Sequence, residues 1–295
     1  MATHNPTRTL SIEKAWNREI NKRWARFRKA TISQLKSINE VSVVANSEIP
    51  FSFDPSLINQ YMIFYQEQID SILMGNDSPP NWQAQYQLDA YIRGLKRTTQ
   101  QLEAQGVQQT LNLDVSGIEI PQSIIVSNLP PAHNAGLEFL YTRSYESLKG
   151  WTDSMARETR SILVDSFNQG LGINKTVSKM VERQNVSRSR ARVIARTETI
   201  QAYQRASTTE VQRAESLTGE EIGMRWVTAL DSRVRHLHAS WHGTITTPEE
   251  NFNRINQSPW NCRCAQVPVV HGTNTKIKRE KFAEERKRLL MLERR

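Results

Sequence analysis

Apolar residues recur every three or four positions over much of the chain, which is the spacing of an amphipathic helix. The clearest example is residues 11–38, where Ser11 can cap the start of the helix. The apolar stripe consists of Trp16, Ile20, Trp24, Phe27, Thr31, Leu35 and Ile38. Its flanks are basic and carry Arg18, Lys22, Arg23, Arg26, Arg28 and Lys29. This pattern predicts one long helix with a basic surface.

Two interpretations of this helix stay open. A basic helix with Trp16 and Trp24 on its apolar side, flanked by Arg23 and Arg26, can dock on a partner protein or a nucleic acid. An ordinary helix would bury both tryptophans in the protein's own core. A membrane surface is the least favoured partner, because the stripe is narrow and interrupted.

The same periodicity predicts further helices. An Asp54-Pro55 start opens one that runs to about residue 74, and a second, at about 80–106, completes a helical hairpin. Residues 111–131 are the least helical in character and are expected to be extended or irregular. More helices are predicted at about 132–149, 151–169, 174–184 and 187–217. Gly219 is the natural stop of the last one.

Arginines crowd the predicted start of the helix at 187–217. They are Arg188, Arg190, Arg192 and Arg196. Positive charge at a helix N-terminus opposes the helix macrodipole, so we expect acidic side chains or phosphate beside them. Glu198 is the local acidic candidate.

The pattern changes after Gly223. The stretches MRWVTALD and CAQVPVV are short and β-prone, and Pro268 suggests that the second strand lies at a sheet edge. Residues 275–295 are again helical in pattern, with nine Lys or Arg against four Glu. We therefore expect a mainly α protein with a small α+β C-terminal module, in which long helices accompany a β-hairpin or a small sheet.

The net charge of +9 is unevenly distributed. Residues 1–40 carry nine basic and three acidic side chains, residues 41–150 carry five and eleven, and residues 151–295 carry 25 and 16. A basic start, an acidic middle and a basic end suggest separate surfaces with separate partners. Solvated helix faces are the simpler explanation of the same pattern.

Two cysteines among 295 residues cannot build a disulfide framework, which favours a reducing compartment. The N-terminus has no apolar run typical of a signal peptide, and no stretch approaches the roughly 18 apolar residues of a membrane span. We expect a cytosolic protein without a membrane partner, unless it leaves the cell inside a larger particle.

Cys262 and Cys264 are one residue apart, so in an extended segment their sulfurs point to the same side. A disulfide across a single residue would be strained. If the segment upstream is helical, His238 and His242 lie one turn apart, and a zinc site of two thiols and one or two histidines becomes a candidate. In the alternative, the cysteines are small buried residues and the histidines form surface hydrogen bonds.

No catalytic motif stands out. The sequence has no Gly-rich phosphate loop, no G-x-S-x-G and no H-E-x-x-H. Asp231 and His238 could form an acid–base pair, but such pairs are common in structural turns. The sequence therefore favours a protein that is not an enzyme.

Four pieces of sequence together form a recognisable pattern. They are Arg196-Thr197-Glu198, the stretch from Trp226 to Asp231, His238 followed by Gly243, and Cys262-Arg263-Cys264. In this order and spacing, residues 150–270 resemble the phage head morphogenesis family, the Mu F-like minor head proteins. Many members of that family carry C-P-x-C where this chain has Arg235 to His238, and with C-R-C this makes a four-thiolate site.

The resemblance implies a zinc site with one ligand in question. His238 can replace one missing thiol, whereas Arg235 cannot replace the other. The implied ligands are His238, Cys262 and Cys264, with His242 as the fourth, or Asp231 or His236 in its place. Alternatively, the site has lost its metal and survives as packing.

The resemblance also implies a structural role in a tailed-phage head. It implies a minor capsid protein that bridges the portal protein and the major capsid protein, in several copies around the portal, with DNA as a further candidate partner. Its place would be the virion head near the portal, and the host cytoplasm during assembly. On this basis we expect a helical docking region at 1–130, a head-morphogenesis-like domain at 131–272 and a basic tail at 273–295.

Two other functions remain open. One is a nucleic-acid-binding protein that uses the arginines from Arg188 to Arg196 and the two basic ends. The other is a phage-encoded enzyme domain, such as a nuclease or transferase, that would depend on Asp231, His238 and Glu198.

Overall fold

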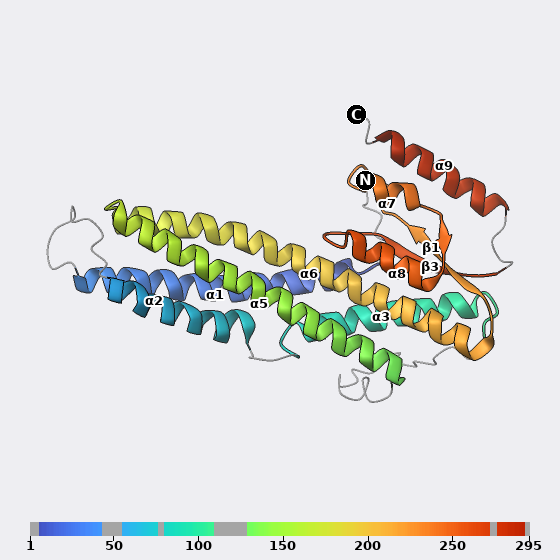
Figure 1. Ribbon diagram of the computed structural model, residues 1–295, viewed down its shortest axis with the longest axis horizontal. Helices are drawn as coiled ribbons and strands as arrows, with labels where there is room; N and C mark the ends of the chain where they lie inside the picture. Colours follow the sequence, from blue (N-terminus) through green and yellow to red (C-terminus); the bar gives the residue numbers. More distant parts are fainter. Residues whose placement is uncertain (1–5, 43–54, 76–79, 109–128, 272–275, 293–295) are drawn as a thin grey trace. The chain divides into compact units, whose positions relative to one another are not determined.

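The computed structural model describes residues 6–42, 55–75, 80–108, 129–271 and 276–292. These residues are mainly helical and carry a three-stranded antiparallel sheet near the C-terminus (Figure 1), which confirms the predicted fold class. Over these ranges, no helix combines the length and the apolar character needed to cross a membrane.

The elements follow one another as helices first and strands later. The helical elements are α1 (Leu10–Ser42), α2 (Pro55–Gln68), the π-helical η1 (Ile69–Met74), α3 (Ala84–Glu103), α5 (Pro131–Asn168), α6 (Ile173–Thr218), α7 (His236–Trp241), α8 (Pro248–Gln257) and α9 (Lys276–Leu292). The strands are β1 (Ile222–Val227), β2 (Ile245–Thr246) and β3 (Ala265–Val270). Gly219 follows α6 with a positive φ of 72°, so it ends that helix as predicted.

The chain forms two compact units, which are described separately. The sheet unit comprises Met1–Lys14, Gln85–Leu140 and Arg196–Arg295, and the bundle unit comprises Ala15–Ala84 and Tyr141–Ala195. By their residue ranges, α1, α5 and α6 contribute to both.

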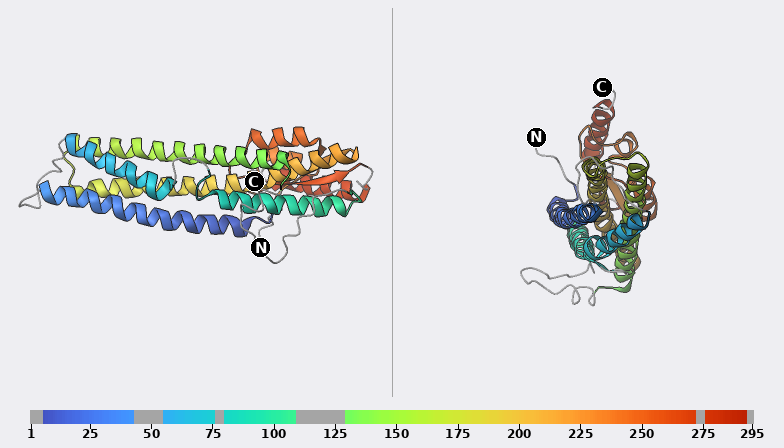
Figure 2. Two further views of the ribbon diagram at one scale, coloured as in Figure 1. Left: turned by 90° about the horizontal axis from the view of Figure 1, so that it is seen from below. Right: turned by 90° about the vertical axis from the view of Figure 1, so that its left-hand side faces the viewer.

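The bundle unit is held by an aromatic core. Its segments of α1, α2, α5 and α6 run side by side (Figures 1 and 2). The ring centroids of Trp24 in α1 and Trp151 in α5 lie 5.6 Å apart, and those of Phe27 and Tyr65 in α2, which meet edge to face, lie 5.1 Å apart. Such ring pairs are worth about 0.5–1.5 kcal/mol beyond their buried area. The aromatic rings therefore join three of the four helices.

The apolar stripe predicted for the first helix is confirmed wherever its side chains are described. Its buried members are Trp16, Ile20, Trp24, Phe27, Thr31 and Leu35, while the side chain of Ile38 lies outside the described part. Trp16 is 1% exposed and Trp24 is 2% exposed. Of the two interpretations of this helix, the structure therefore supports the one in which the tryptophans belong to the core.

The sheet unit is organised around β1, which lies between the other two strands. It pairs with β3 over six positions, from Ile222 with Val270 to Val227 with Ala265. Strand β3 is an edge strand, as Pro268 predicted. Gln105 covers this edge, because its amide donates to the carbonyl of Pro268 at 3.1 Å and accepts from the Val270 amide at 3.1 Å.

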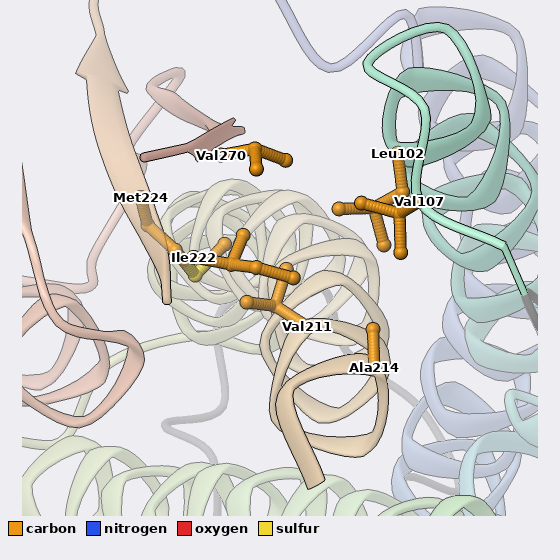
Figure 3. Packing of buried hydrophobic residues seen from close by; sticks show 7 residues of the cluster. All are labelled: Leu102, Val107, Val211, Ala214, Ile222, Met224 and Val270. Atoms are coloured by element: carbon orange, nitrogen blue, oxygen red, sulfur yellow. The ribbon is translucent and has the colours of Figure 1, made fainter. Parts of the chain in front are cut away.

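A buried apolar cluster fastens the sheet to the helices (Figure 3). Its members are Leu102, Val107, Val211, Ala214, Ile222, Met224 and Val270. They come from α3 and the turn after it, from α6, and from β1 and β3, and their side chains point toward one another. Fully burying a side chain of this kind stabilises the fold by about 1.5–3 kcal/mol. A three-stranded sheet too small to be stable alone is thereby anchored on α6.

Two predicted helix breaks are wrong. The separate helices expected at 132–149 and 151–169 are the single helix α5, and those at 174–184 and 187–217 are the single helix α6. Gly150 is exposed in the middle of α5, where glycine costs only about 1 kcal/mol relative to alanine. Burial of Leu148 and Trp151 on either side outweighs that cost.

Residues 245–257 contain two elements that periodicity did not reveal, β2 and α8. The N-terminus of α8 has a local signature, since the Thr247 hydroxyl accepts a hydrogen bond from the Glu250 amide at 3.2 Å and Pro248 occupies the first turn. Asp54 and most of the stretch 111–131 lie outside the described residues. The three-segment division at residues 130 and 272 stays a prediction.

The exposed glycine in α5 provides a test of helix continuity. Replacing Gly150→Ala should stabilise the protein by about 0.5–1 kcal/mol, because alanine lowers the entropic cost of the helix and its Cβ would meet no atom within 4 Å. Urea denaturation followed by tryptophan fluorescence measures the change. Destabilisation by this substitution would show that α5 is broken at this point.

Candidate metal centre and the motif residues around it

The structure brings His238, Cys262 and Cys264 together. The Nδ1 atom of His238, from α7, lies 3.5 Å from the sulfur of Cys262 and 3.5 Å from that of Cys264. All three side chains are buried, and their ligand atoms lie within 4.8 Å of one another. The two cysteines directly precede β3, so the predicted second strand begins one residue later than expected, at Ala265.

The donor set fits a zinc ion. Tetrahedral zinc with ordinary Zn–S and Zn–N bond lengths would separate a sulfur and a nitrogen by about 3.6 Å. A hydrogen bond from Cys264, with His238 as a further cause, holds the pKa of the Cys262 thiol well below its ordinary value despite burial. Burial, reinforced by Cys262, raises the pKa of Cys264 well above its ordinary value. Without a metal, the same distances suit thiol–imidazole hydrogen bonds.

The fourth ligand expected from the sequence is not brought to the thiols. Helix α7 ends at Trp241, and the backbone of His242 turns away with φ −54° and ψ 124°. Its Nδ1 accepts a hydrogen bond from the Thr228 amide at 3.1 Å, and its Nε2 lies 3.0 Å from Glu285 of α9. His236 is exposed. Within the described residues, the group that could hold a metal therefore has three protein ligands.

Aromatic rings enclose His238. Its imidazole stacks on Trp241 at 5.4 Å and meets the edge of Trp226 at 5.4 Å. Trp226, Ile255 and the two cysteines form one buried cluster, with Trp241 packed against it. Such a shell keeps water from the sulfurs and holds the imidazole in place.

Asp231 forms a bidentate ion pair with Arg263, the residue between the two cysteines. Both guanidinium–carboxylate contacts measure 2.6 Å, and the Arg233 amide also donates to Asp231 at 3.0 Å. The hydrogen bonds from Arg263 hold the pKa of Asp231 well below its ordinary range. The acid–base pairing of Asp231 with His238 considered above is not what the structure shows, because the carboxylate is engaged by Arg263.

The Arg-Thr-Glu motif on α6 holds the loop that carries the cysteines. The Arg196 guanidinium bonds to Glu13 at 2.9 Å and to the side-chain oxygen of Asn261 at 3.1 Å. The Thr197 hydroxyl accepts from the Asn261 amide at 3.0 Å. Two turns further along α6, the Gln204 side chain donates to the carbonyl of Cys264 at 2.9 Å. The motif therefore acts on the position of Cys262 and Cys264 through Asn261.

The acidic partner of Arg196 is Glu13 and not Glu198, which the sequence had suggested. Arg196 pairs with Glu13, whereas Glu198 is buried at 1% exposure within α6. The macrodipole argument also fails, because α6 begins at Ile173 and these arginines lie in its middle. Sequence spacing could not reveal Glu13, which lies 183 positions from Arg196.

Gly243 has a steric reason for being glycine. Its φ is +79°, and a Cβ there would lie 2.4 Å from the Cβ of Phe282 on α9. Any other residue would both strain the backbone and displace the helix.

The residues expected to contact partners fall into two groups. Trp16 and Trp24 are buried, and Arg23 is used within the bundle unit, where it bonds to Glu19 at 3.0 Å and to the carbonyl of Ile72 at 2.8 Å. The others are at least partly accessible, namely Arg26, Arg188, Arg190 and Arg192.

Comparison with known proteins identifies the segment that contains the motif. Residues 158–267 match the family model described as Phage Mu protein F like protein. This segment resembles the Mu F-like proteins. It includes every residue of the four-part pattern, from Arg196 to Cys264, which confirms the resemblance drawn from the sequence.

A curated relative extends the comparison. The chain is 28% identical over 130 residues to "Minor head protein GP7" of Bacillus phage SPP1, which covers 39% of this chain and 41% of that protein. The chain thus matches about two fifths of the length of that relative. No solved structure matches the chain. The Mu F-like segment is therefore the part of the molecule whose relationship rests on a family model.

The Asp231–Arg263 pair makes a prediction about pH. Because the pKa of Asp231 is lowered in the folded state, the pair contributes fully at neutral pH. Its contribution begins to decline near the unfolded value of about 3.9 and is lost as the pH falls through the much lower folded-state pKa. Replacing Asp231→Asn should cost about 1–2 kcal/mol at pH 7 and clearly less near pH 2, where the carboxylate is protonated in the unfolded chain. Urea denaturation at both pH values measures this.

Asp153→Asn is the control, since it removes the same charge at a partly exposed position of α5. An equal effect of the two substitutions at pH 7, or an Asp231→Asn effect that does not depend on pH, would contradict the assigned role of the pair.

Proposed function

We propose that this protein is a minor head protein of a tailed bacteriophage that joins the portal to the capsid shell during head assembly. The proposal is supported by the Mu F-like segment at residues 158–267 and by the similarity to a protein named as a minor head protein. The protein would be located in the virion head near the portal, and in the host cytoplasm during assembly. Several copies would surround the portal and would contact DNA.

A structural role is supported by the contacts that the motif residues make with other residues of the protein. Arg196 is bound to Glu13 and Asn261, and Asp231 is bound to Arg263. His238 is enclosed by two tryptophan rings. These side chains hold one another in place, and an acid or base in a reaction would need to be accessible to a substrate. This favours an assembly module over the nuclease or transferase alternative.

The head role is tested by assembling heads with and without the portal. In heads assembled from the major capsid protein, the portal and this protein, we expect it to co-sediment at a few copies per portal. In shells assembled without the portal it should be absent. Recovery only as a free monomer, or equal incorporation into shells with and without the portal, would contradict the bridging role. Quantitative mass spectrometry of gradient-purified heads provides the measurement.

We also propose that His238, Cys262 and Cys264 bind one zinc ion in the Mu F-like segment. The three donors are buried and spaced as zinc requires, and zinc would cross-link α7 to the loop before β3. The protein would supply three ligands, and the described residues His242, His236 and Asp231 are committed or directed elsewhere.

Zinc content tests this directly. Protein purified without added metal should contain about one zinc per chain by mass spectrometry, and Cys262→Ser or Cys264→Ser should abolish it and lower the melting temperature. His236→Ala, which changes an exposed histidine two residues from His238, should keep the zinc. Wild-type protein free of zinc and insensitive to chelators would leave packing as the role of the cluster.

A further inference from the structure

A groove in the bundle unit concentrates positive charge. It follows α1 from Asn21 to Lys36, with Arg188 of α6 on one side, and has a volume of about 520 Å³. At the helical rise of 1.5 Å per residue, its length is about 22 Å. The side chains that give it its chemistry are Asn21, Arg28, Lys29, Ser33, Lys36 and Arg188. All six can donate hydrogen bonds, and four are cations.

Among the residues whose side chains the structure describes, no carboxylate lines this groove. Within the described part of the chain, none of its four cations forms an ion pair, although other arginines on the same helices do. Arg23 on α1 pairs with Glu19 at 3.0 Å, and Arg183 on α6 pairs with Glu158. The positive charge of the groove is therefore not neutralised by the described residues, whereas the charges of Arg23 and Arg183 are.

Two buried donors add to this picture. Arg188 and Trp24 both line the groove. The Nε atom of Arg188 and the indole nitrogen of Trp24 are buried and have no hydrogen-bond partner among the described residues. Trp24 is 2% exposed. A buried donor without a partner destabilises the fold, and a ligand rich in hydrogen-bond acceptors could satisfy such donors.

We propose that this groove binds the phosphate backbone of DNA. Unpaired arginines and lysines together with short polar donors are the side chains that contact phosphates. One strand of DNA carries a phosphate about every 3.4 Å of helix axis, so several phosphates fit a groove of this length. An acidic protein surface fits less well, because lysine, which the groove presents twice, is depleted in the cores of protein interfaces. This inference rests on the proposed function for its biological setting, since it specifies where the DNA contact would lie.

The geometry also revises the residues expected from the sequence. Of the predicted contact arginines, Arg188 lies in the groove, whereas Arg23 is used within the unit. Arg28, Lys29 and Lys36 join it from α1. No recognition of bases is expected, because backbone contacts carry no sequence information.

The test uses the purified full chain and a fluorescent 20-base-pair duplex. Anisotropy titrations between 50 and 200 mM salt provide the affinity and its salt dependence. The double variant Arg28→Gln with Arg188→Gln should bind roughly fifty-fold more weakly near 0.1 M salt, and its log–log salt slope should be smaller by about 2, because two phosphate contacts are lost. Arg28→Lys with Arg188→Lys keeps both charges and should retain most of the affinity.

The matched control is Lys175→Gln with Lys179→Gln. It removes the same charge from exposed positions near the start of α6, outside the groove. Equal weakening by both double Gln variants would overturn the proposal in favour of a net-charge effect. Competition by polyglutamate as strong as that by unlabelled duplex would also overturn it, in favour of an acidic protein ligand. Loss of binding in the groove variant alone supports it.

Measuring incorporation into heads together with DNA binding tests the groove assignment and the head role independently. A groove variant that no longer binds DNA but still enters portal-containing heads supports both. A wild-type protein that binds DNA through the groove but never enters heads would contradict the head role and leave the groove assignment intact. Circular dichroism and a thermal melt establish that each variant is folded.

Discussion

The antiparallel pairing of β1 with β3 is the constraint on which the candidate site depends. In an antiparallel pair, the end of one strand lies beside the start of the other, and here Val227 pairs with Ala265. The residues after β1 and those before β3 therefore emerge at the same end of the sheet. This places His238 beside Cys262 and Cys264 and also brings Asp231 to Arg263.

Polar contacts then hold this end of the sheet in place. The loop before β3 is bound to α6 through Asn261 and through the Cys264 carbonyl. The turn after β1 is bound to that loop through the Asp231–Arg263 ion pair. At the opposite end of the strand pair, where Ile222 pairs with Val270, the apolar cluster anchors β1 and β3 to α3 and α6. The Mu F-like pattern is thus a set of mutual contacts, which explains why its residues occur together although they are far apart in the chain.

Charged residues have two different uses in this protein. Arg196, Arg263 and Arg23 each have a carboxylate partner, and these pairs position loops and helices. Arg28, Lys29, Lys36 and Arg188 have none among the described residues and line a groove. The composition, with its net charge of +9, cannot separate these uses. Only the location of each carboxylate in the folded chain distinguishes a structural cation from one that faces a ligand.

The sequence was enough to predict the helical character, the apolar stripe of α1, the two main strands and the edge position of β3, because each depends on periodicity or on a local residue preference. The motif also indicated that His238, Cys262 and Cys264 belong together. Four features became clear only in the folded chain: Trp16 and Trp24 are core residues, Gly150 does not interrupt α5, His242 points to Glu285, and Glu13 pairs with Arg196. These outcomes depend on contacts between distant residues and on burial that outweighs local preference, and no spacing along the chain encodes either.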